Sequence, residues 1–541
     1  MAQIIRETDI EALIAEGDRT KIQTAYNALD CCVPREVSDV LESRLDEDTA
    51  RIYAFEHACQ APALTMTLRG VLIDEERRAA AIDAFTETEE KASDEITRLA
   101  ADIWDGFDKR TGHCIDADNI DYRNHLWRRS SPDFVNTCRR CGLSRLVPSR
   151  VNCNSSQQIQ HLLYDLIGVK KRHDRRSGLP TVDKEALESI RGEALKQGNI
   201  NTAEIANQAI IGKQARKQTG YARSKVGIDG RMRNSNNVGA AETGRWSAST
   251  SPLWDGWNIQ QIADQLRHIV IADPGLELGY ADLEQAESHI VAYDAGDERY
   301  INAHATGDVH TYVCRLMWPS LPWTGDLKLD RQLADQPPDF DPYHSRRDYG
   351  KRFQHGGNMG RTPQGVARQI HCPVSEAQEA YGRMYGGWGF EGAFPGIKIR
   401  HQELHAEIQR TGISISCFGR KRQFLNRTWT TETLREALGQ LEQSPVADLL
   451  NLGLLRVWEE MDLQLNVWNA PHPDQPNRVW LLAQVHDAIL FLYRPGDVGA
   501  LRRVKELMEM PILLNGRLFT IPVEIAVGPS WNKSALTKVK L

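Results

Sequence analysis

The pattern of apolar and polar residues predicts helices in the first half of the chain and strands further on. Apolar residues recur at helical spacing over 74–104, 155–168 and 199–216. Short apolar runs of strand length are LELGYAD, which ends at Asp282, and the pair VWLLAQV and ILFLY, with only His486, Asp487 and Ala488 between them. Two apolar runs with so short a connection predict a β-hairpin. The Pro- and Trp-rich stretch 317–343 is expected to be loop.

The length and charge of the chain narrow the classes of protein to consider. With 541 residues, 41% hydrophobic and 26% charged, it is long enough for several packed units. No apolar run reaches the ~20 residues of a membrane span, and MAQIIRETDIEAL lacks the order of a secretory signal, so we expect a cytoplasmic protein without membrane contact. Because the net charge is −7, contact with nucleic acid must come from local basic stretches such as GKQARKQTGYARSK and SRRDYGKR.

Two aspartates are candidates for metal chemistry. Asp282 ends an apolar strand, and Asp487 lies at the tip of the expected hairpin. Nucleotidyl transfer uses two cations about 3.5–4 Å apart, and Mg²⁺ binds to carboxylates together with phosphate and water oxygens. Taken alone, either residue is better explained as a helix cap or a turn residue, which is the usual role of an aspartate at a strand end.

A cationic stripe is expected on a helix further along the chain. Arg347, Lys351 and His355 recur every four residues, which places them on one helix face. Such a face suits a triphosphate, because Arg offers a two-pronged donor and Lys a point charge. The alternative is an ordinary basic face in contact with solvent.

Several motifs occur in the order found in one known family. They are YADLEQAESHIVAYDAGDERY, GDVHTYV, RRDYGKRFQHGGNMG and AQVHDAILF, supported by TGRWSAS with NIQQI, VNCNSSQQI, FGRKR and QSPVAD. From about Ala54 to the C-terminus the chain resembles the family A DNA polymerases, of the bacterial DNA polymerase I and phage-replicase kind. The resemblance implies an α+β, mostly helical right-hand polymerase, with an antiparallel palm sheet, fingers and a thumb. It also implies template-directed addition of dNTPs to a primer 3′-hydroxyl.

The resemblance also assigns roles to individual residues. Asp282, Asp487 and the carbonyl of Leu283 would hold two Mg²⁺ ions, and Lys351 would protonate the departing pyrophosphate. The residues implied to bind the dNTP are Arg347, Lys351, His355, Gln285, Glu287, His310 and Met359. Those implied to contact the primer-template DNA are Arg245, Gln260, Arg435, Gln443, Gln484 and His486. Glu287 would be the steric gate that excludes a ribose 2′-hydroxyl.

The chain departs from the family pattern near the proposed gate. Met359 stands where family members usually have a tyrosine that hydrogen-bonds the gate glutamate, and a methionine cannot make that bond. His355 stands where Phe or Tyr is common, and Ala488 replaces a third acid. Gly356 and Gly357 are each expected to weaken their helix by roughly 1 kcal/mol relative to alanine. We still expect Glu287 to exclude ribonucleotides.

The resemblance predicts how the chain is divided. The expected parts are an exonuclease remnant at 1–53, a thumb at 54–103 and 154–215, an inserted cysteine-bearing module at 104–153, a palm at 216–300 and 401–541, and fingers at 301–400. YNALDCCVPREV resembles the last motif of a proofreading exonuclease, with Tyr26 and Asp30 in the Tyr-x3-Asp arrangement. Only 25 residues precede Tyr26, so no complete exonuclease is expected. A separately encoded exonuclease subunit is a candidate partner, and the alternative is a vestigial helix.

Four cysteines in or beside the insertion suggest a structural metal. Cys138 and Cys141 have the spacing of a zinc knuckle, and Cys114 and Cys153 would complete a four-cysteine site for structural Zn²⁺. The alternative is a set of unligated thiols in a loop.

Two other functions remain open at this stage. A single-subunit RNA polymerase has a related palm, although Glu287 and the TGRWS and NIQQI elements argue against it. A catalytically silent DNA-binding protein with the same fold is the second alternative, and the presence of Asp282, Lys351 and Asp487 argues against that.

Overall fold

The fold is known from a computed structural model, which describes most of the chain. The described residues are 16–17, 19–104, 114–115, 121–122, 127–128, 135–138, 144–146, 150–174, 176–251, 255–305, 307–370, 372–424, 430–462 and 471–541.

A five-stranded antiparallel sheet forms the centre of the molecule, with the strand order β14-β15-β11-β18-β19. Its strands are β14 (Val479–Val485), β15 (Ala488–Tyr493), β11 (Glu277–Leu283), β18 (Val523–Gly528) and β19 (Thr537–Lys538). The two apolar runs that predicted a hairpin are β14 and β15, and Ala488 belongs to the strand rather than to the turn. Every residue of β14 and β15 is buried, which requires that both faces of this part of the sheet be covered.

Two separate apolar cores cover the two faces. On one face, Leu481, Ile489 and Phe491 pack with residues of three helices. These helices are α4 (Glu47–Arg69), α18 (Thr431–Val457) and α19 (Val498–Met508). On the other face, Trp480 and Leu490 pack with short segments that precede β11. These segments are β1 (Val71–Ile73), β7 (Arg231–Met232), η2 (Ile259–Gln261), α9 (Asp264–Arg267) and β10 (Val270–Ile271), of which β10, β1 and β7 form a small sheet.

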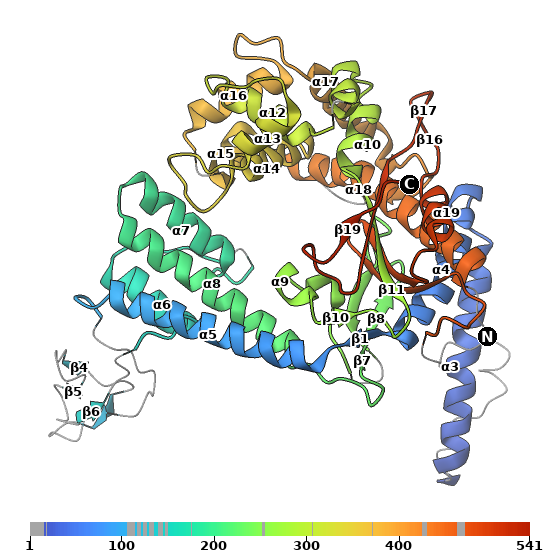
Figure 1. The fold of residues 1–541 in the computed structure, drawn as a ribbon, viewed down its shortest axis with the longest axis horizontal. Coiled ribbons are helices and arrows are strands. Elements are labelled where there is room, and N and C mark those ends of the chain that lie inside the picture. The colour runs from blue at the N-terminus through green and yellow to red at the C-terminus, as the bar shows by residue number, and fades with distance from the viewer. Residues whose placement is uncertain are drawn as a thin grey trace.

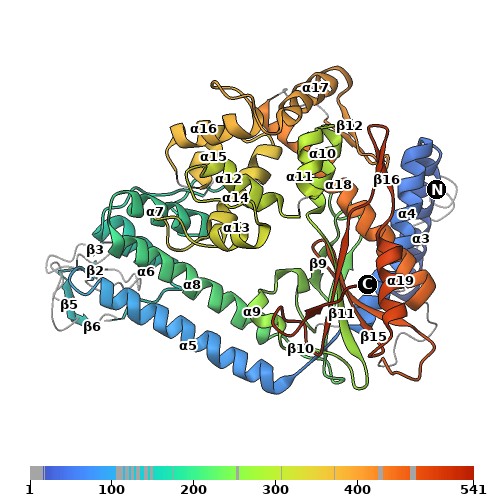
Figure 2. The ribbon, with the colours of Figure 1, turned by 45° about the horizontal axis from the view of Figure 1, so that its top comes forward.

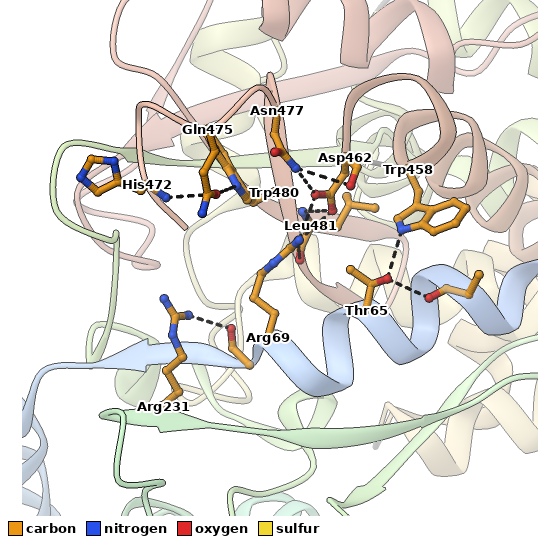
Figure 3. A network of polar contacts seen from close by, with 12 residues as sticks. Thr65, Arg69, Arg231, Trp458, Asp462, His472, Gln475, Asn477, Trp480 and Leu481 are labelled. Carbon is orange, nitrogen blue, oxygen red and sulfur yellow. Dashed lines mark hydrogen bonds and ion pairs between the residues drawn. The ribbon is translucent and has the colours of Figure 1, made fainter. Parts of the chain in front are cut away.

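A buried ion pair ties helix α4 to η3 (Trp458–Asp462), next to the strand β14 (Figure 3). Arg69, at the end of α4, donates to both carboxylate oxygens of Asp462, at 2.7 and 3.0 Å. It also donates to the carbonyl of Leu481 at 2.6 Å, while the Leu481 amide donates to Asp462 at 2.8 Å. The register of β14 shifts just after Leu481. The pair therefore satisfies polar backbone groups at the point where the strand is irregular.

A group of long helices extends away from the sheet (Figures 1 and 2). The expected helices at 74–104, 155–168 and 199–216 are all present, with small differences at their ends. They are α5 (Glu75–Leu99), α6 (Ser156–Gln160) with the π-helix η1 (His161–Leu166), and α8 (Ile200–Ala222), and they pack with α7 (Lys184–Lys196). Helix α5 begins directly after β1, and its N-cap Asp74 accepts from the Arg77 amide.

A second helical group follows β11 and has its own apolar core. Its helices are α10 (Ala286–Asp294), α11 (Glu298–Ala305), α12 (Val309–Met317), α13 (Leu327–Ala334), α14 (Arg346–Asn358), α15 (Pro363–Gln369), α16 (Val374–Tyr385) and α17 (Pro395–Thr411). Helix α13 lies in the stretch that was expected to be loop, so that expectation is wrong there. Asp330 in this helix is buried, where it accepts hydrogen bonds from the nearby Thr324 and Gly325 and pairs with Arg315 of α12.

The remaining described elements are short or peripheral. Helix α3 (Arg19–Glu42) projects from the side of the sheet (Figure 1). The short strands are β2 (Cys114–Ile115), β3 (Asp121–Tyr122), β4 (Trp127–Arg128), β5 (Val135–Cys138), β6 (Ser144–Leu146), β8 (Asn234–Asn237), β9 (Ser247–Thr250), β12 (Ile413–Ile415), β13 (Lys421–Gln423), β16 (Ile512–Leu514) and β17 (Arg517–Phe519), and η3 (Trp458–Asp462) is a π-helix. The expected α+β, mostly helical class with an antiparallel sheet is confirmed. Within the described ranges, none of the helices is both long and apolar enough for a membrane span.

Candidate active site

Asp282 is fixed at the carboxyl end of the middle strand of the sheet. Its register partners are Ala488 in β15 and Glu524 in β18. Ala281 and Leu283, on either side of it in β11, point into the apolar core. Because side chains alternate along a strand, Asp282 is turned away from that core, and it lines a cavity of about 940 Å³.

Asp487 reaches the same cavity from the β14–β15 hairpin. Val485 pairs with Ala488, so His486 and Asp487 form a two-residue turn, and His486 takes the left-handed conformation that such turns require, with φ 56°. The amide of Leu283 donates to the carbonyl of Asp487 at 3.1 Å. This bond connects the two acidic segments directly, although they are far apart in the sequence.

Other acidic side chains lie close to the two aspartates and affect their pKa values. Burial, together with repulsion from Asp487, Glu524 and Glu284, raises the pKa of Asp282 to about 6. Burial also raises the pKa of Asp487, and the nearby Arg245 opposes that rise. A cation bound between the two carboxylates would relieve this repulsion.

The donor set fits Mg²⁺ rather than a metal enclosed entirely by protein. In the part of the chain that the structure describes, no group of three or more His, Cys, Asp or Glu residues could hold a metal ion. Mg²⁺ is commonly held by one or two carboxylates, with water and substrate phosphates completing its octahedron. Asp282 and Asp487 can supply those carboxylates.

Helix α14 forms another wall of the cavity. A capping box between Ser345 and Asp348 fixes its first turn. Arg347 extends from that turn and makes a two-pronged ion pair with Asp308, Nε–Oδ2 3.0 Å and Nη2–Oδ1 3.1 Å. Burial acts to raise the pKa of Asp308, but the hydrogen bonds from Arg347 and Thr311 hold it below its ordinary value. The guanidinium is therefore oriented beside the cavity before any substrate arrives.

Lys351 and His310 lie beside Arg347 on the same cavity. Lys351 is exposed, and among the described residues it makes no hydrogen bond or ion pair, so its charge is available to a ligand. The His310 ring contacts the side-chain oxygen of Gln354 at 2.7 Å. Burial lowers the pKa of His310 to about 4, so its ring is neutral at pH 7.

Glu287, in the first turn of α10, faces α14 across the cavity. Its carboxylate contacts the guanidinium of Arg245 through one oxygen and lies 3.4 Å from Nδ1 of His355 through the other. Arg245 also lies 3.7 Å from Asp487. Gln285, which starts α10 in a left-handed conformation with φ 48°, donates to the Gly307 carbonyl at 3.3 Å. All of these residues except Arg245 line the cavity.

A smaller cavity of 290 Å³ adjoins the first and shares His486 and Asp487 with it. Arg245, Gln260 and Gln484 also line it. The structure thus brings together four of the six residues that the sequence assigned to primer-template contact.

Three predicted residues lie outside the described lining of these two cavities. Arg435 and Gln443 are on α18, where Arg435 is exposed. Met359 caps the end of α14, and its sulfur lies 3.8 Å from a Cβ built on Gly439. Met359 therefore packs toward α18, and within the α14 stripe His355 is the residue beside Glu287.

Other cavity residues were not identified from the sequence. In the sequence Asp308 has the features of an ordinary helix N-cap. Its pairing with Arg347 depends on the packing of α12 against α14. Glu524 lies opposite Asp282 only through strand register. Glu442 is buried on α18 and reaches the same cavity, and no sequence pattern distinguishes it from the core residues around it.

Among the side chains that the structure describes, no group of three or more His, Cys, Asp or Glu residues could hold the zinc ion predicted for the four cysteines. Cys153 is buried in the core of the α5–α8 helices, where its thiol donates to the carbonyl of Glu89 at 3.6 Å. Its sulfur would lie 2.2 Å from a Cβ on Gly212, so it fills a gap between helices rather than facing the insertion. Cys138 is also buried. Cys141 and the side chain of Cys114 lie outside the described residues, as do the side chains of Tyr26 and Asp30.

Comparison with known proteins gives a consistent result. The model of DNA polymerase family A matches residues 141–533. DNA polymerase I of Mycobacterium tuberculosis (strain ATCC 25618 / H37Rv) is 27% identical over 410 residues, which cover 72% of this chain and 39% of that protein. DNA polymerase I of Chloroflexus aurantiacus is 24% identical over 394 residues, covering 71% of this chain and 37% of that protein. The chain thus spans about two fifths of the length of these relatives.

A solved structure has the same fold. The POL domain of Pol1 from M. smegmatis, in complex with DNA primer-template and dNTP, superimposes with a TM-score of 0.62 at 21% sequence identity. The match covers 94% of this chain and 74% of that one.

Proposed function

The chain belongs to the family A DNA polymerases, and from that premise we propose that it copies a DNA template by adding dNTPs to a primer 3′-hydroxyl. One observation carries the proposal. Asp282 and Asp487, from distant parts of the sequence, line one cavity together with Arg347 and Lys351 of α14. Paired carboxylates beside a cationic helix face match the needs of nucleotidyl transfer, which requires metal binding and a triphosphate site together.

In this proposal Asp282, Asp487 and the carbonyl of Leu283 hold two Mg²⁺ ions. When bound, such ions activate the attacking 3′-oxygen and neutralise charge on the leaving oxygen. Burial raises the pKa of both carboxyls, and the charge of Asp487 adds to the rise at Asp282; a bound cation would offset these effects. The protein itself forms no covalent intermediate, and it contributes position and charge.

The dNTP would bind along α14. Arg347 and Lys351 would contact its triphosphate, and Lys351 would donate a proton to the departing pyrophosphate. His310, neutral at pH 7, would donate a hydrogen bond to a phosphate oxygen rather than supply charge. Gln285, His355 and Met359 would border the nucleotide, and Glu287 would close the space beside C2′ of its sugar.

The primer-template duplex would lie across the smaller cavity. Arg245, Gln260, Gln484 and His486 would contact the primer end, and Arg435 and Gln443 of α18 would contact DNA beyond it. Contacts of this kind in the minor groove suit a replicase, because the acceptors there are nearly independent of sequence.

The domain assignment follows from the same premise. The central sheet with α18 and α19 corresponds to the palm, α11–α16 to the fingers, and α5–α8 to the thumb. Residues 104–153 form a module inserted in the thumb, and residues before 54 are the remnant of an exonuclease domain.

We propose further that a separate exonuclease subunit docks on α3. Val37, Val40 and Leu41 are exposed on that helix, at the spacing of one face. Pull-down from native extract, followed by a 3′-exonuclease assay, tests this idea. Absence of nuclease activity in the recovered complex would remove it.

Primer extension decides the main proposal. We expect Mg²⁺-dependent extension of a primed template with dNTPs, and a loss of about 10²- to 10³-fold for Asp487→Asn, by analogy with the loss of other electrostatic groups at catalytic centres. Asp474→Asn, at an exposed loop residue whose side chain is 90% accessible, is the matched control. Extension with NTPs in place of dNTPs would instead indicate an RNA polymerase, and no extension by the intact protein would indicate a silent DNA-binding role.

A further inference from the structure

The carboxylate of Glu287 is held between two side chains from different elements. Arg245, between β8 and β9, contacts Oε1, and His355, on α14, lies 3.4 Å from Oε2. Glu287 is itself only 22% exposed. A partly buried carboxylate with both oxygens engaged has little freedom to turn.

The surroundings of Glu287 make these contacts necessary. Glu442 lies in the same cavity on α18, and burial, with Glu287 and Asp294 nearby, raises its pKa well above the ordinary value. On the other side Asp487 adds a second negative charge, to which Glu287 is electrostatically coupled. Among the described residues, the ion-pair contacts of Glu287 are those with Arg245 and His355, and these two hold its carboxylate in position.

These two partners are not equivalent. Arg245 also lies 3.7 Å from Asp487 and lines the smaller cavity, so its guanidinium is shared among a gate residue, a catalytic acid and the DNA expected there. His355 has Glu287 as its ion-pair partner. Met359, one turn further on, is directed toward Gly439 of α18 and carries no hydrogen-bond donor.

We propose that His355 is the positioning residue that aims Glu287 at the nucleotide sugar, and that it takes this role because Met359 cannot. The inference rests on the proposed role of Glu287 as the sugar gate. A gate excludes a 2′-hydroxyl only if its own atoms stay in place. Loss of the His355 contact therefore lets the carboxylate turn away and admits ribonucleotides, while the metal and triphosphate groups stay intact.

The test is the ratio of kcat/KM for a dNTP to kcat/KM for the matching rNTP, measured by single-nucleotide extension. We expect His355→Ala to lower this ratio by up to about 5-fold, the range for loss of one partly exposed ion-pair contact. His355→Asn should restore most of the ratio, because the asparagine Nδ2 can occupy the place of the histidine Nδ1 and donate. Arg352→Ala, at a neighbouring position of α14 outside the lining of the cavity, should leave the ratio unchanged.

Glu287→Ala distinguishes a failure of the proposed sugar gate from a failure of the proposed role of His355. If that variant loses selectivity and His355→Ala adds nothing to it in the double variant, the two residues act as one unit. If Glu287→Ala loses selectivity but His355→Ala alone keeps it, the positioning role of His355 is wrong while the gate stands. If Glu287→Ala keeps selectivity, the gate itself is wrong and the proposed role of His355 falls with it.

Discussion

Arg69 and Asp462 are 393 residues apart in the sequence and form a two-pronged ion pair in the interior, with side chains 2% and 0% exposed. Both members also bond to Leu481 of β14, the strand that leads to the Asp487 turn (Figure 3). Removing one member leaves the other buried and unpaired, which costs about 3–5 kcal/mol. We therefore expect Arg69→Met to lower the free energy of unfolding in urea by that amount.

A surface ion pair provides the control for this change. Arg503 pairs with Glu460 at 2.7 Å, and both side chains are at least 40% exposed, so Arg503→Met should cost less than about 1 kcal/mol. The double variant Arg69→Met/Asp462→Leu should recover part of the stability, because it removes both buried charges. Equal losses for Arg69→Met and Arg503→Met would contradict the structural role assigned to the buried pair.

Gly357 is expected to resist substitution because of a close approach inside the second helical group. A Cβ built on Gly357 would lie 2.2 Å from the hydroxyl of Tyr385. Tyr385 is fully buried and bonded to Asn358 at 3.1 Å, so it cannot move aside cheaply. Gly357→Ala should therefore destabilise the protein by about 1–3 kcal/mol, measured by denaturant unfolding.

Gly220, inside α8, gives the matched comparison. A Cβ built there meets nothing within 4 Å, so Gly220→Ala should stabilise the helix by up to about 1 kcal/mol. If both alanine variants were more stable than the wild type, Tyr385 would have to shift, and helix propensity alone would determine the change in stability.

The sequence predicted the elements whose signal is local. The apolar runs ending at Asp282 and flanking Asp487 form adjacent strands, and the four-residue spacing of Arg347, Lys351 and His355 lies on one helix as expected. These features follow from strand length and helical period, which can be read without knowing what packs where.

The features that the sequence could not give depend on contacts between distant segments. The prolines and tryptophans around α13 led to the expectation of a loop there. The helix contains the buried carboxylate of Asp330, which Arg315 of α12 contacts. Cys153 was assigned to a metal site from its spacing, yet a gap opposite Gly212 places it in a helical core. The contact between His355 and Glu287 depends on how α14 packs against α10, which neither local sequence determines.

Arg347 should govern affinity for the incoming nucleotide. Hydrogen bonds to charged groups are worth about 1.5–3 kcal/mol, so Arg347→Ala should raise the KM for dNTP by about 10- to 100-fold. Asp308→Asn should act in the same direction but less strongly, because Arg347 then keeps its charge and loses the partner that orients it.

The neighbouring arginine tests whether this effect is specific. Arg346 bonds to the backbone carbonyls of Leu333 and Gln336, at 3.5 and 3.4 Å, and it points away from the cavity wall that Arg347 forms. Arg346→Ala should leave the KM for dNTP near the wild-type value in steady-state extension assays. An unchanged KM in Arg347→Ala would remove Arg347 from the triphosphate site.

A stacked pair of histidines should make stability depend on pH. His289 and His304 stack with ring centroids 3.9 Å apart. Burial lowers the pKa of His289 to about 4, and burial with the neighbouring His289 lowers that of His304 to about 3. The unfolded chain, where a histidine has a pKa near 6.5, binds protons more readily. The free energy of unfolding should therefore be independent of these groups above about pH 7 and should fall as the pH drops from 6.5 toward 4, by up to about 1.4 kcal/mol per pH unit for each histidine.

Asp282 acts in the opposite direction over part of this range. Its pKa of about 6 lies above the unfolded value, so its protonation stabilises the folded state as the pH falls below 6. The contribution of a histidine is therefore best isolated by comparing variants. His289→Phe keeps the stacked ring and removes one titrating group, so its urea midpoint should fall less steeply than that of the wild type between pH 6.5 and 4. His472→Phe, at a side chain that is 60% exposed, should follow the wild-type slope. A slope unchanged in His289→Phe would mean that His289 is charged in the folded protein despite its burial.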